Sequence, residues 1–197
     1  MLNCVDGGDL TALLPDLLAD ITAPEHWEIR AESFWCYVEP PGFSRRIQGW
    51  KIHVSATAES APSVLEISAG VLLRRRACFK FAKGLEEVAE LTSMRYPRSG
   101  GGKFITVYPD DDEHFGVLAE ELHRATAGLA GPTILSDRPY RQGSLVSYRY
   151  GGFTSALSRL DDDGSYVPAL VAPDGTWVED RREARFTPPP WAPPFPG

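Results

Sequence analysis

The residues best suited to chemistry lie in the sequence GWKIHVS, residues 49–55. Side chains alternate across a β-strand, so Lys51, His53 and Ser55 are expected on one face and the apolar residues between them on the other. A fixed cation beside an imidazole that titrates near neutral pH can bind an anion and transfer a proton. This segment therefore predicts a small reactive site on the polar face of a strand.

A second basic residue, Lys80, lies between Phe79 and Phe81. In a strand, alternation places the two rings on one face and the amine on the other. Partial removal of that amine from water would favour its neutral form, which can accept a proton. Lys80 is therefore a candidate general base.

Arginine residues and a glycine-rich turn complete the candidate set. Arg98 lies close to the glycines 100–102, whose backbone amides can form an anion-binding concavity. Arg138 and Arg149 provide two more guanidinium groups that can bind phosphate oxygens in a forked geometry. Tyr108 ends the strand that follows the glycines. Together these residues predict an anion pocket that contains an acid and a base.

Each feature also has a purely structural interpretation. A strand histidine is more often a satisfied structural residue, and roughly one in ten would be catalytic. A single lysine on a strand is usually a surface amine with a buried stem, and an arginine beside glycines usually belongs to a solvated turn. Taken one at a time, the structural interpretation is favoured for every residue.

Composition limits the class of protein. The chain has 197 residues and a formal net charge of -7, which argues against binding nucleic acid by phosphate neutralisation. Cys4, Cys36 and Cys78 are odd in number and lack zinc-site spacing, so we expect neither a disulfide framework nor a metal site. Residues at the start of this sequence lack a basic region followed by an apolar one, so no secretory signal is expected, and no apolar run approaches the length of a membrane span. A cytosolic location is the default expectation.

The spacing of apolar residues predicts alternating helices and strands. Helices are predicted over 9–20, 61–75, 85–94 and 113–128, the first with Asp9 as N-cap and Pro15 as an interruption. Strands are predicted over 27–38, 50–56, 78–81, 103–108, 133–135 and 145–150. Because these strands carry polar residues on one face, we expect an α+β fold with a largely antiparallel twisted sheet and packed helices. The alternation would also fit the α/β class.

Five segments resemble the N-terminal lyase domain of class III lanthipeptide synthetases in sequence, order and spacing. They are GWKIHVSAT (49–57), FKFA (79–82), GKFITVYP (102–109), GPTILSDRPY (131–140) and YRYGGF (148–153). Such synthetases contain lyase, kinase-like and cyclase-like regions in that order. The lyase region is more distantly similar to the phosphothreonine lyases that bacterial pathogens inject into host cells. The resemblance covers about residues 27–153 and implies the same α+β fold.

The resemblance implies β-elimination of phosphate from phosphoserine or phosphothreonine in a precursor peptide, which leaves dehydroalanine or dehydrobutyrine. It places the catalytic base at Lys80 and the general acid at His53, with Tyr108 in a supporting or proton-transfer role. It implies phosphate contacts from four basic residues, namely Lys51, Arg98, Arg149 and Arg138. Elimination has no water to activate, so neither a metal nor another cofactor is expected.

The resemblance also implies domain boundaries and partners. Residues 1–26 are expected to form an N-terminal helical segment, 27–186 the lyase domain, and 187–197 a proline-rich linker towards a missing kinase domain. The expected partners are a phosphorylated precursor peptide and the kinase and cyclase domains of the same synthetase. An alternative function is a noncatalytic docking module for a phosphopeptide or leader peptide. Binding alone needs no general base and no titrating acid, so Lys80 together with His53 favours the enzyme.

Overall fold

The computed structural model describes residues 8–19, 26–154, 158–160, 166–181 and 186–195. Within these residues, the main sheet has the strand order β1-β2-β4-β5-β3-β7-β6, and each neighbouring pair is antiparallel. Its strands are β1 (Glu28–Ala31), β2 (Trp35–Glu39), β3 (Gln48–Val54), β4 (Cys78–Ala82), β5 (Ile105–Tyr108), β6 (Arg138–Pro139) and β7 (Val146–Gly152). The predicted α+β class with a largely antiparallel sheet is confirmed.

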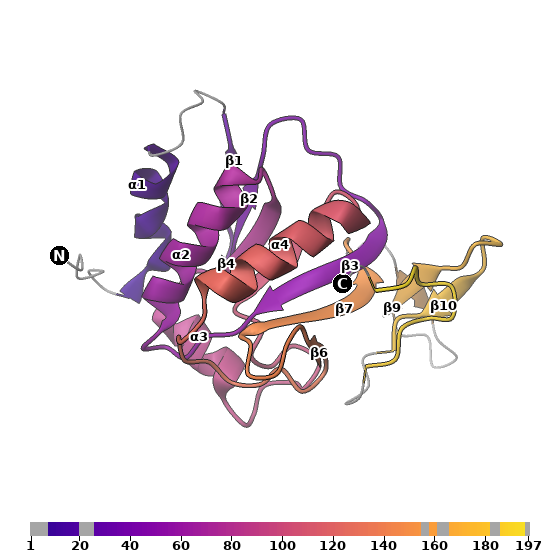
Figure 1. The fold of residues 1–197 in the computed structure, drawn as a ribbon. Helices are drawn as coiled ribbons and strands as arrows, with labels where there is room; N and C mark the ends of the chain where they lie inside the picture. The colour runs from indigo at the N-terminus through magenta and orange to yellow at the C-terminus, as the bar shows by residue number, and fades with distance from the viewer. Residues whose placement is uncertain (1–7, 20–25, 155–157, 161–165, 182–185, 196–197) are drawn as a thin grey trace.

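A smaller sheet lies beyond the end of β7 (Figure 1). It consists of β8 (Ser158–Leu160), β9 (Tyr166–Val171) and β10 (Trp177–Glu179), in the order β10-β9-β8. The side chain of Gln48 in β3 connects the two sheets, because it donates to the carbonyl of Val171 and accepts from its N–H, both at 2.7 Å. The sequence patterns did not predict these strands.

Helices cover one face of the main sheet, with α2 (Ala61–Arg74) and α4 (Asp112–Ala125) lying across it side by side (Figure 1). The 3-10 turn η2 (Leu10–Leu13) and α1 (Leu14–Ala19) pack on α2, and α3 (Leu85–Thr92) packs beside β4. Asp9 caps η2 as predicted, because its carboxylate accepts from the N–H of Thr11 at 2.9 Å. Pro15 is tolerated because it lies in the first turn of α1, where its missing N–H would have no helical partner. The helix predictions are confirmed, with ends that differ by a few residues.

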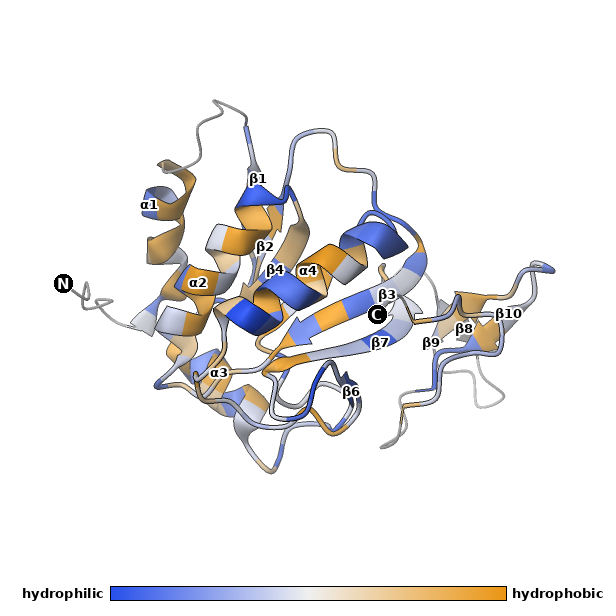
Figure 2. Ribbon diagram, viewed as in Figure 1, coloured by the Kyte–Doolittle hydropathy of each residue, from blue (hydrophilic) through white to orange (hydrophobic). Residues whose placement is uncertain are grey.

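The apolar face of β3 fixes the orientation of its polar face. Hydrophobic and hydrophilic residues alternate along this strand (Figure 2). Trp50, Ile52 and Val54 are at most 3% exposed and point to the helix-covered side, where the Trp50 ring lies 6.3 Å from that of Phe115 in α4. Complete burial of such a side chain contributes about 1.5–3 kcal/mol. The intervening polar residues are thereby held on the opposite face of the sheet.

Two strand predictions were wrong. The single strand expected over 27–38 is the hairpin β1–β2, closed where the N–H of Glu32 donates to the carbonyl of Trp35 at 2.8 Å. That turn contains neither glycine nor proline, so it could not be predicted from turn-forming residues. The strand expected over 133–135 is a turn, in which the N–H of Asp137 donates to the carbonyl of Ile134 at 3.2 Å. Only Ile134 of this apolar run is buried, which is too little to hold a strand in the sheet.

The proline-rich segment at the end of the described chain packs on the helix-covered face. The ring of Phe195 stacks on that of Tyr148, with centroids 4.1 Å apart, and Trp191 and Ala192 also contact the core. The packed domain therefore includes this segment up to Phe195. Its role as a linker to another domain stays a prediction.

Cys36 and Cys78 are buried free thiols. Burial raises the pKa of Cys36 to about 11 and that of Cys78 to about 12. Cys4 lies outside the described residues. None of the described helices has the length and apolar character that crossing a membrane requires.

Candidate active site

Strand pairing brings the predicted residues together in two neighbouring rows on the face opposite the helices. In the first row, Lys80 of β4 pairs with Thr106 of β5, and Thr106 pairs with His53 of β3. In the second row, Lys51 pairs with Arg149 of β7. Directly paired residues share a face and have Cβ atoms about 4.5–5.5 Å apart. Register alone therefore places a candidate base, a candidate acid and two cations next to one another.

These side chains line a cleft of about 500 Å³. Tyr108 joins them from the end of β5. One wall comes from Trp35 and from the loop after α3, including Ser99 and Gly100. Another wall comes from the small sheet and its flanks, through Tyr166, Pro168, Ala169 and Asp180. The cleft is thus built by both sheets.

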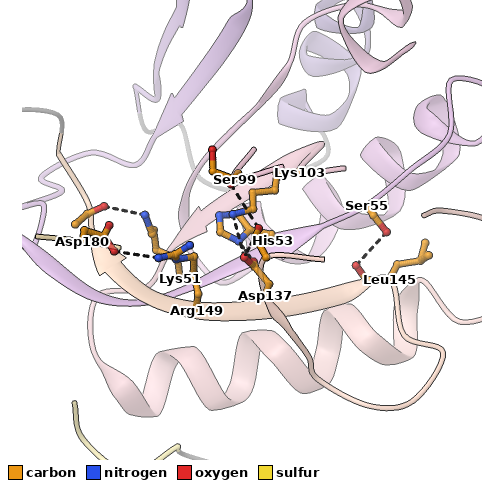
Figure 3. A network of polar contacts seen from close by, with 11 residues as sticks. Lys51, His53, Ser55, Ser99, Lys103, Asp137, Leu145, Arg149 and Asp180 are labelled. Atoms are coloured by element: carbon orange, nitrogen blue, oxygen red, sulfur yellow. Dashed lines mark hydrogen bonds and ion pairs between the residues drawn. The ribbon is translucent and has the colours of Figure 1, made fainter. Parts of the chain in front are cut away.

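His53 is held by a buried carboxylate. Its Nδ1 lies 2.5 Å from Oδ2 of Asp137, whose other oxygen, Oδ1, lies 2.9 Å from Nζ of Lys103 (Figure 3). The three residues are at most 8% exposed. With Nδ1–H donating to Asp137, the second ring nitrogen Nε2 is left to exchange a proton with a ligand.

The surroundings of His53 set its protonation state. Burial lowers the pKa of His53 to about 3, and the Lys103 and Lys51 ammonium groups act in the same direction. The Asp137 carboxylate opposes this shift, because it stabilises an imidazolium. Burial alone would raise the pKa of Asp137, but its interactions with His53 and Lys103 hold that pKa below its ordinary range. These protein groups by themselves keep His53 neutral near pH 7 and Asp137 ionised.

Lys51 and Arg149 form the cationic part of the cleft. Nζ of Lys51 donates to the carbonyl of Gly152 at 2.8 Å, and Nη2 of Arg149 lies 3.0 Å from Oδ1 of Asp180 (Figure 3). Arg149 is 3% exposed, and its Nε is buried without a hydrogen-bond partner among the described residues. A buried guanidinium N–H without a partner is unusual and is explained if a ligand oxygen binds there.

Lys80 is held over aromatic rings at the other end of its row. Nζ lies 4.0 Å from the centroid of the Trp35 ring and 5.7 Å from that of Tyr37. The side chain is half-buried and lines the cleft. The ring faces fix the position of the amine by cation–π attraction.

Tyr108 lies where its strand ends, with its ring 5.4 Å from that of Phe153 and 4.9 Å from Cζ of Arg45. These packing contacts hold the ring at the edge of the cleft. Ser55, the third polar residue of β3, instead donates from Oγ to the carbonyl of Leu145 at 3.4 Å. It does not line the cleft.

Two of the predicted arginines lie outside the cleft lining. Arg98 is exposed, although Ser99 and Gly100 beside it line the cleft. A phosphate contact from Arg98 stays a prediction. Arg138 pairs with Tyr148, whose ring stacks in the core on the helix-covered face. Cζ of Arg138 lies 5.9 Å from the centroid of the Phe186 ring, which Arg149 also contacts, and a phosphate contact from Arg138 stays a prediction.

Sequence reasoning missed three charged residues of the site: Lys103, Asp137 and Asp180. His53 and Asp137 are 84 positions apart, and Arg149 and Asp180 are 31 apart, so no local spacing links either pair. Asp137 belongs to the resembling segment 131–140, but Arg138 was the residue of that segment that was predicted to belong to the site. Asp180 lies in a region for which no helix or strand was predicted.

The chain is similar in sequence to known proteins. Residues 16–196 match the family described as the N-terminal domain of RamC. A probable SapB synthase from Streptomyces coelicolor is 38% identical over 176 residues, which are 89% of this chain. The chain spans only 19% of the length of that relative.

Solved phosphothreonine lyases share the fold. The SpvC effector from Salmonella superposes with a TM-score of 0.52 at 15% identity, over 74% of this chain and 76% of that one. OspF from Shigella flexneri gives 0.50 at 15% identity, over 71% and 86% of the two chains. The similarities inferred from the five sequence segments are therefore confirmed at the level of family and fold.

Proposed function

The chain belongs to the family of RamC N-terminal domains, and we propose that it catalyses β-elimination of phosphate from phosphoserine or phosphothreonine in a precursor peptide. The product is dehydroalanine or dehydrobutyrine. The observation that carries the proposal is the pair of rows on one sheet face, which places Lys80 and His53 beside the cations Lys51 and Arg149. A phosphopeptide-docking surface would need the cations but neither the base nor the acid.

Lys80 removes the proton from Cα of the phosphorylated residue. Its neutral amine accepts the proton and becomes an ammonium, and the electron pair left on Cα forms the double bond to Cβ. The Trp35 ring, 4.0 Å from Nζ, stabilises the positive charge as it develops. The same contact keeps the flexible lysine chain in one position, which reduces the entropy lost on reaching the transition state.

His53 donates a proton to the bridging oxygen as the bond from Cβ to that oxygen breaks. The imidazole must carry protons on both nitrogens for this step, and a bound phosphate dianion favours that form by its charge. Asp137 holds Nδ1 and stabilises the imidazolium, so the binding of substrate turns a neutral residue into the required acid.

Lys51 and Arg149 hold the phosphate and offset the charge that builds up on it as it leaves. Tyr108 borders the same space and supports the bound group. No water is activated in this reaction, so the proposed chemistry needs no metal. The substrate is a precursor peptide phosphorylated by a kinase, and in a longer synthetase the kinase and cyclase regions would act before and after this domain.

Asp137→Asn is expected to shift the pH dependence of turnover. The acid form of His53 is present below its pKa in the substrate complex and is lost above it, so kcat falls on the alkaline side. The Asp137 carboxylate raises that pKa, and its removal should move the alkaline limb to lower pH. The measurement is kcat against pH for both proteins, with Asp174→Asn as the control, because Asp174 is exposed in the turn between β9 and β10 and does not line the cleft. An unmoved limb, or one moved to higher pH, would contradict this role of Asp137.

The proposed reaction itself is tested by incubating the chain with a phosphoserine peptide and measuring the molecular mass of the product. Elimination makes the peptide lighter by one phosphoric acid, without added metal or nucleotide.

A further inference from the structure

We infer that Asp180 is a positioning residue, which orients Arg149 so that one edge of its guanidinium faces the phosphate. The inference rests on the proposed function and adds a part of the site that comes from outside the main sheet. Asp180 directly follows β10, and its backbone N–H donates to the carbonyl of Pro168 in β9 at 2.8 Å. The small sheet therefore fixes the position of this carboxylate.

The contact between Asp180 and Arg149 is a buried ion pair. Oδ1 of Asp180 lies 3.0 Å from Nη2 of Arg149, and the two side chains are 4% and 3% exposed. The same Nη2 also donates to the carbonyl of Arg181 at 3.4 Å. Removing both charges from water is costly, and a hydrophobic pair could fill the same space without that cost. An ion pair at this position is therefore better explained by a need to orient the guanidinium than by stability.

The contacts of Arg149 leave its Nε–H for a ligand. Asp180 and Arg181 engage Nη2, whereas the buried Nε has no hydrogen-bond partner among the described residues. Behind the guanidinium, Cζ lies 5.3 Å from the ring of Phe186. The guanidinium is thus fixed from the C-terminal part of the chain, and its Nε–H is the donor still to be satisfied. Phosphate oxygens are suitable acceptors for it.

The opposite role for Asp180 would be to occupy the position of the phosphate and compete with it. A carboxylate that fully occupied the phosphate position would be expected to accept from Nε–H as well as from Nη2. The contact from Arg149 to Asp180 uses Nη2 and leaves Nε–H without a partner among the described residues, and a guanidinium with five N–H groups can bind a carboxylate and a phosphate at the same time. Arg149 and Lys51 together still carry one more charge than Asp180, so the site keeps a net attraction for an anion.

The test is a double-mutant cycle on peptide binding, measured by calorimetric titration in a Lys80→Ala parent that cannot turn over. The ligands are a peptide with one phosphoserine and its unphosphorylated counterpart. Asp180→Asn should weaken binding of the phosphopeptide about tenfold, as expected for a charged hydrogen bond, and leave the unphosphorylated peptide unchanged. In an Arg149→Met background the same Asp180→Asn change should have no further effect, because the group that it positions is gone.

Two further variants separate positioning from charge and from folding. Glu179→Gln removes the same charge from the neighbouring exposed residue and should bind like the parent. Asp180→Glu keeps the charge but moves the carboxylate by one methylene, so a positioning role predicts weaker phosphopeptide binding here as well. Thermal unfolding of each variant shows whether it is folded.

The inference is overturned if Asp180→Asn and Asp180→Glu both bind like the parent, or if the loss from Asp180→Asn persists in the Arg149→Met background. Tighter binding by Asp180→Asn would also overturn it, because Asp180 would then compete with the phosphate. A parent that binds both peptides equally would overturn the proposed function and this inference together. A parent that prefers the phosphopeptide, with no effect of Asp180, would overturn this inference alone.

Discussion

Replacing Lys80 with alanine is expected to lower the rate of elimination by about 10³-fold, which is within the usual range for loss of a general base. Affinity for the phosphopeptide should change little, because Lys80 acts on the Cα proton in the transition state and not on the phosphate of the ground state. The change removes an amine that lies over the Trp35 ring and is half-buried, so the sheet should tolerate it.

The measurement is a single-turnover rate with saturating enzyme, paired with a titration of the same peptide. Lys83→Ala, one residue beyond the end of β4 and outside the cleft lining, is the matched control and should keep the parent rate. Substantial elimination by Lys80→Ala would assign the base to another group. An equal loss of affinity and rate would mean that Lys80 mainly binds the substrate.

Arg149→Ala is expected to weaken phosphopeptide binding by about 1.5–3 kcal/mol, the range for a hydrogen bond to a charged group. Binding of the unphosphorylated peptide should barely change. Arg149→Lys should recover only part of the loss, since an ammonium keeps the charge but not the planar fork. The measurement is calorimetric titration of both peptides in the Lys80→Ala parent, with thermal unfolding as a check, because Arg149→Ala leaves the buried Asp180 without its partner.

Arg124→Ala is the control for this experiment. The same type of charge is removed from α4, on the opposite face of the main sheet, where the side chain is largely exposed, so phosphopeptide affinity should not change. If Arg149→Ala weakens both peptides equally, the guanidinium shapes the peptide groove or the fold, and the phosphate binds elsewhere. If Arg124→Ala matches Arg149→Ala, the loss reflects the overall charge of the protein and not a phosphate site.

Alternation along single strands was enough to predict much of the site. Lys51 and His53 share a face of β3 because Trp50, Ile52 and Val54 are buried on the other, and this period-two pattern is visible in the sequence. The same reasoning placed Lys80 opposite the flanking phenylalanines. The polar faces of the strands also favoured an antiparallel sheet, and the resemblance to known lyases implied the same fold and added the reaction in which these residues are proposed to act.

Features that depend on distant parts of the chain could not be predicted in the same way. The carboxylates Asp137 and Asp180 reach their basic partners only after the sheets have formed, so no local spacing reveals them. The face of Arg138 could not be predicted either, because it depends on the register between β6 and β7, and one residue of shift reverses the face. The hairpin β1–β2 was missed because its turn lacks glycine and proline.

The most direct test of the account is the mass of a phosphoserine peptide after incubation with the purified chain, without added metal or nucleotide. β-Elimination predicts a product that is lighter by one phosphoric acid. This product gains the mass of one thiol when a thiol is added across the new double bond. A product that retains its serine hydroxyl would mean hydrolysis, and so would contradict elimination. An unchanged peptide, with folded protein that binds it, would leave the domain as a docking module and remove the roles proposed for Lys80 and His53.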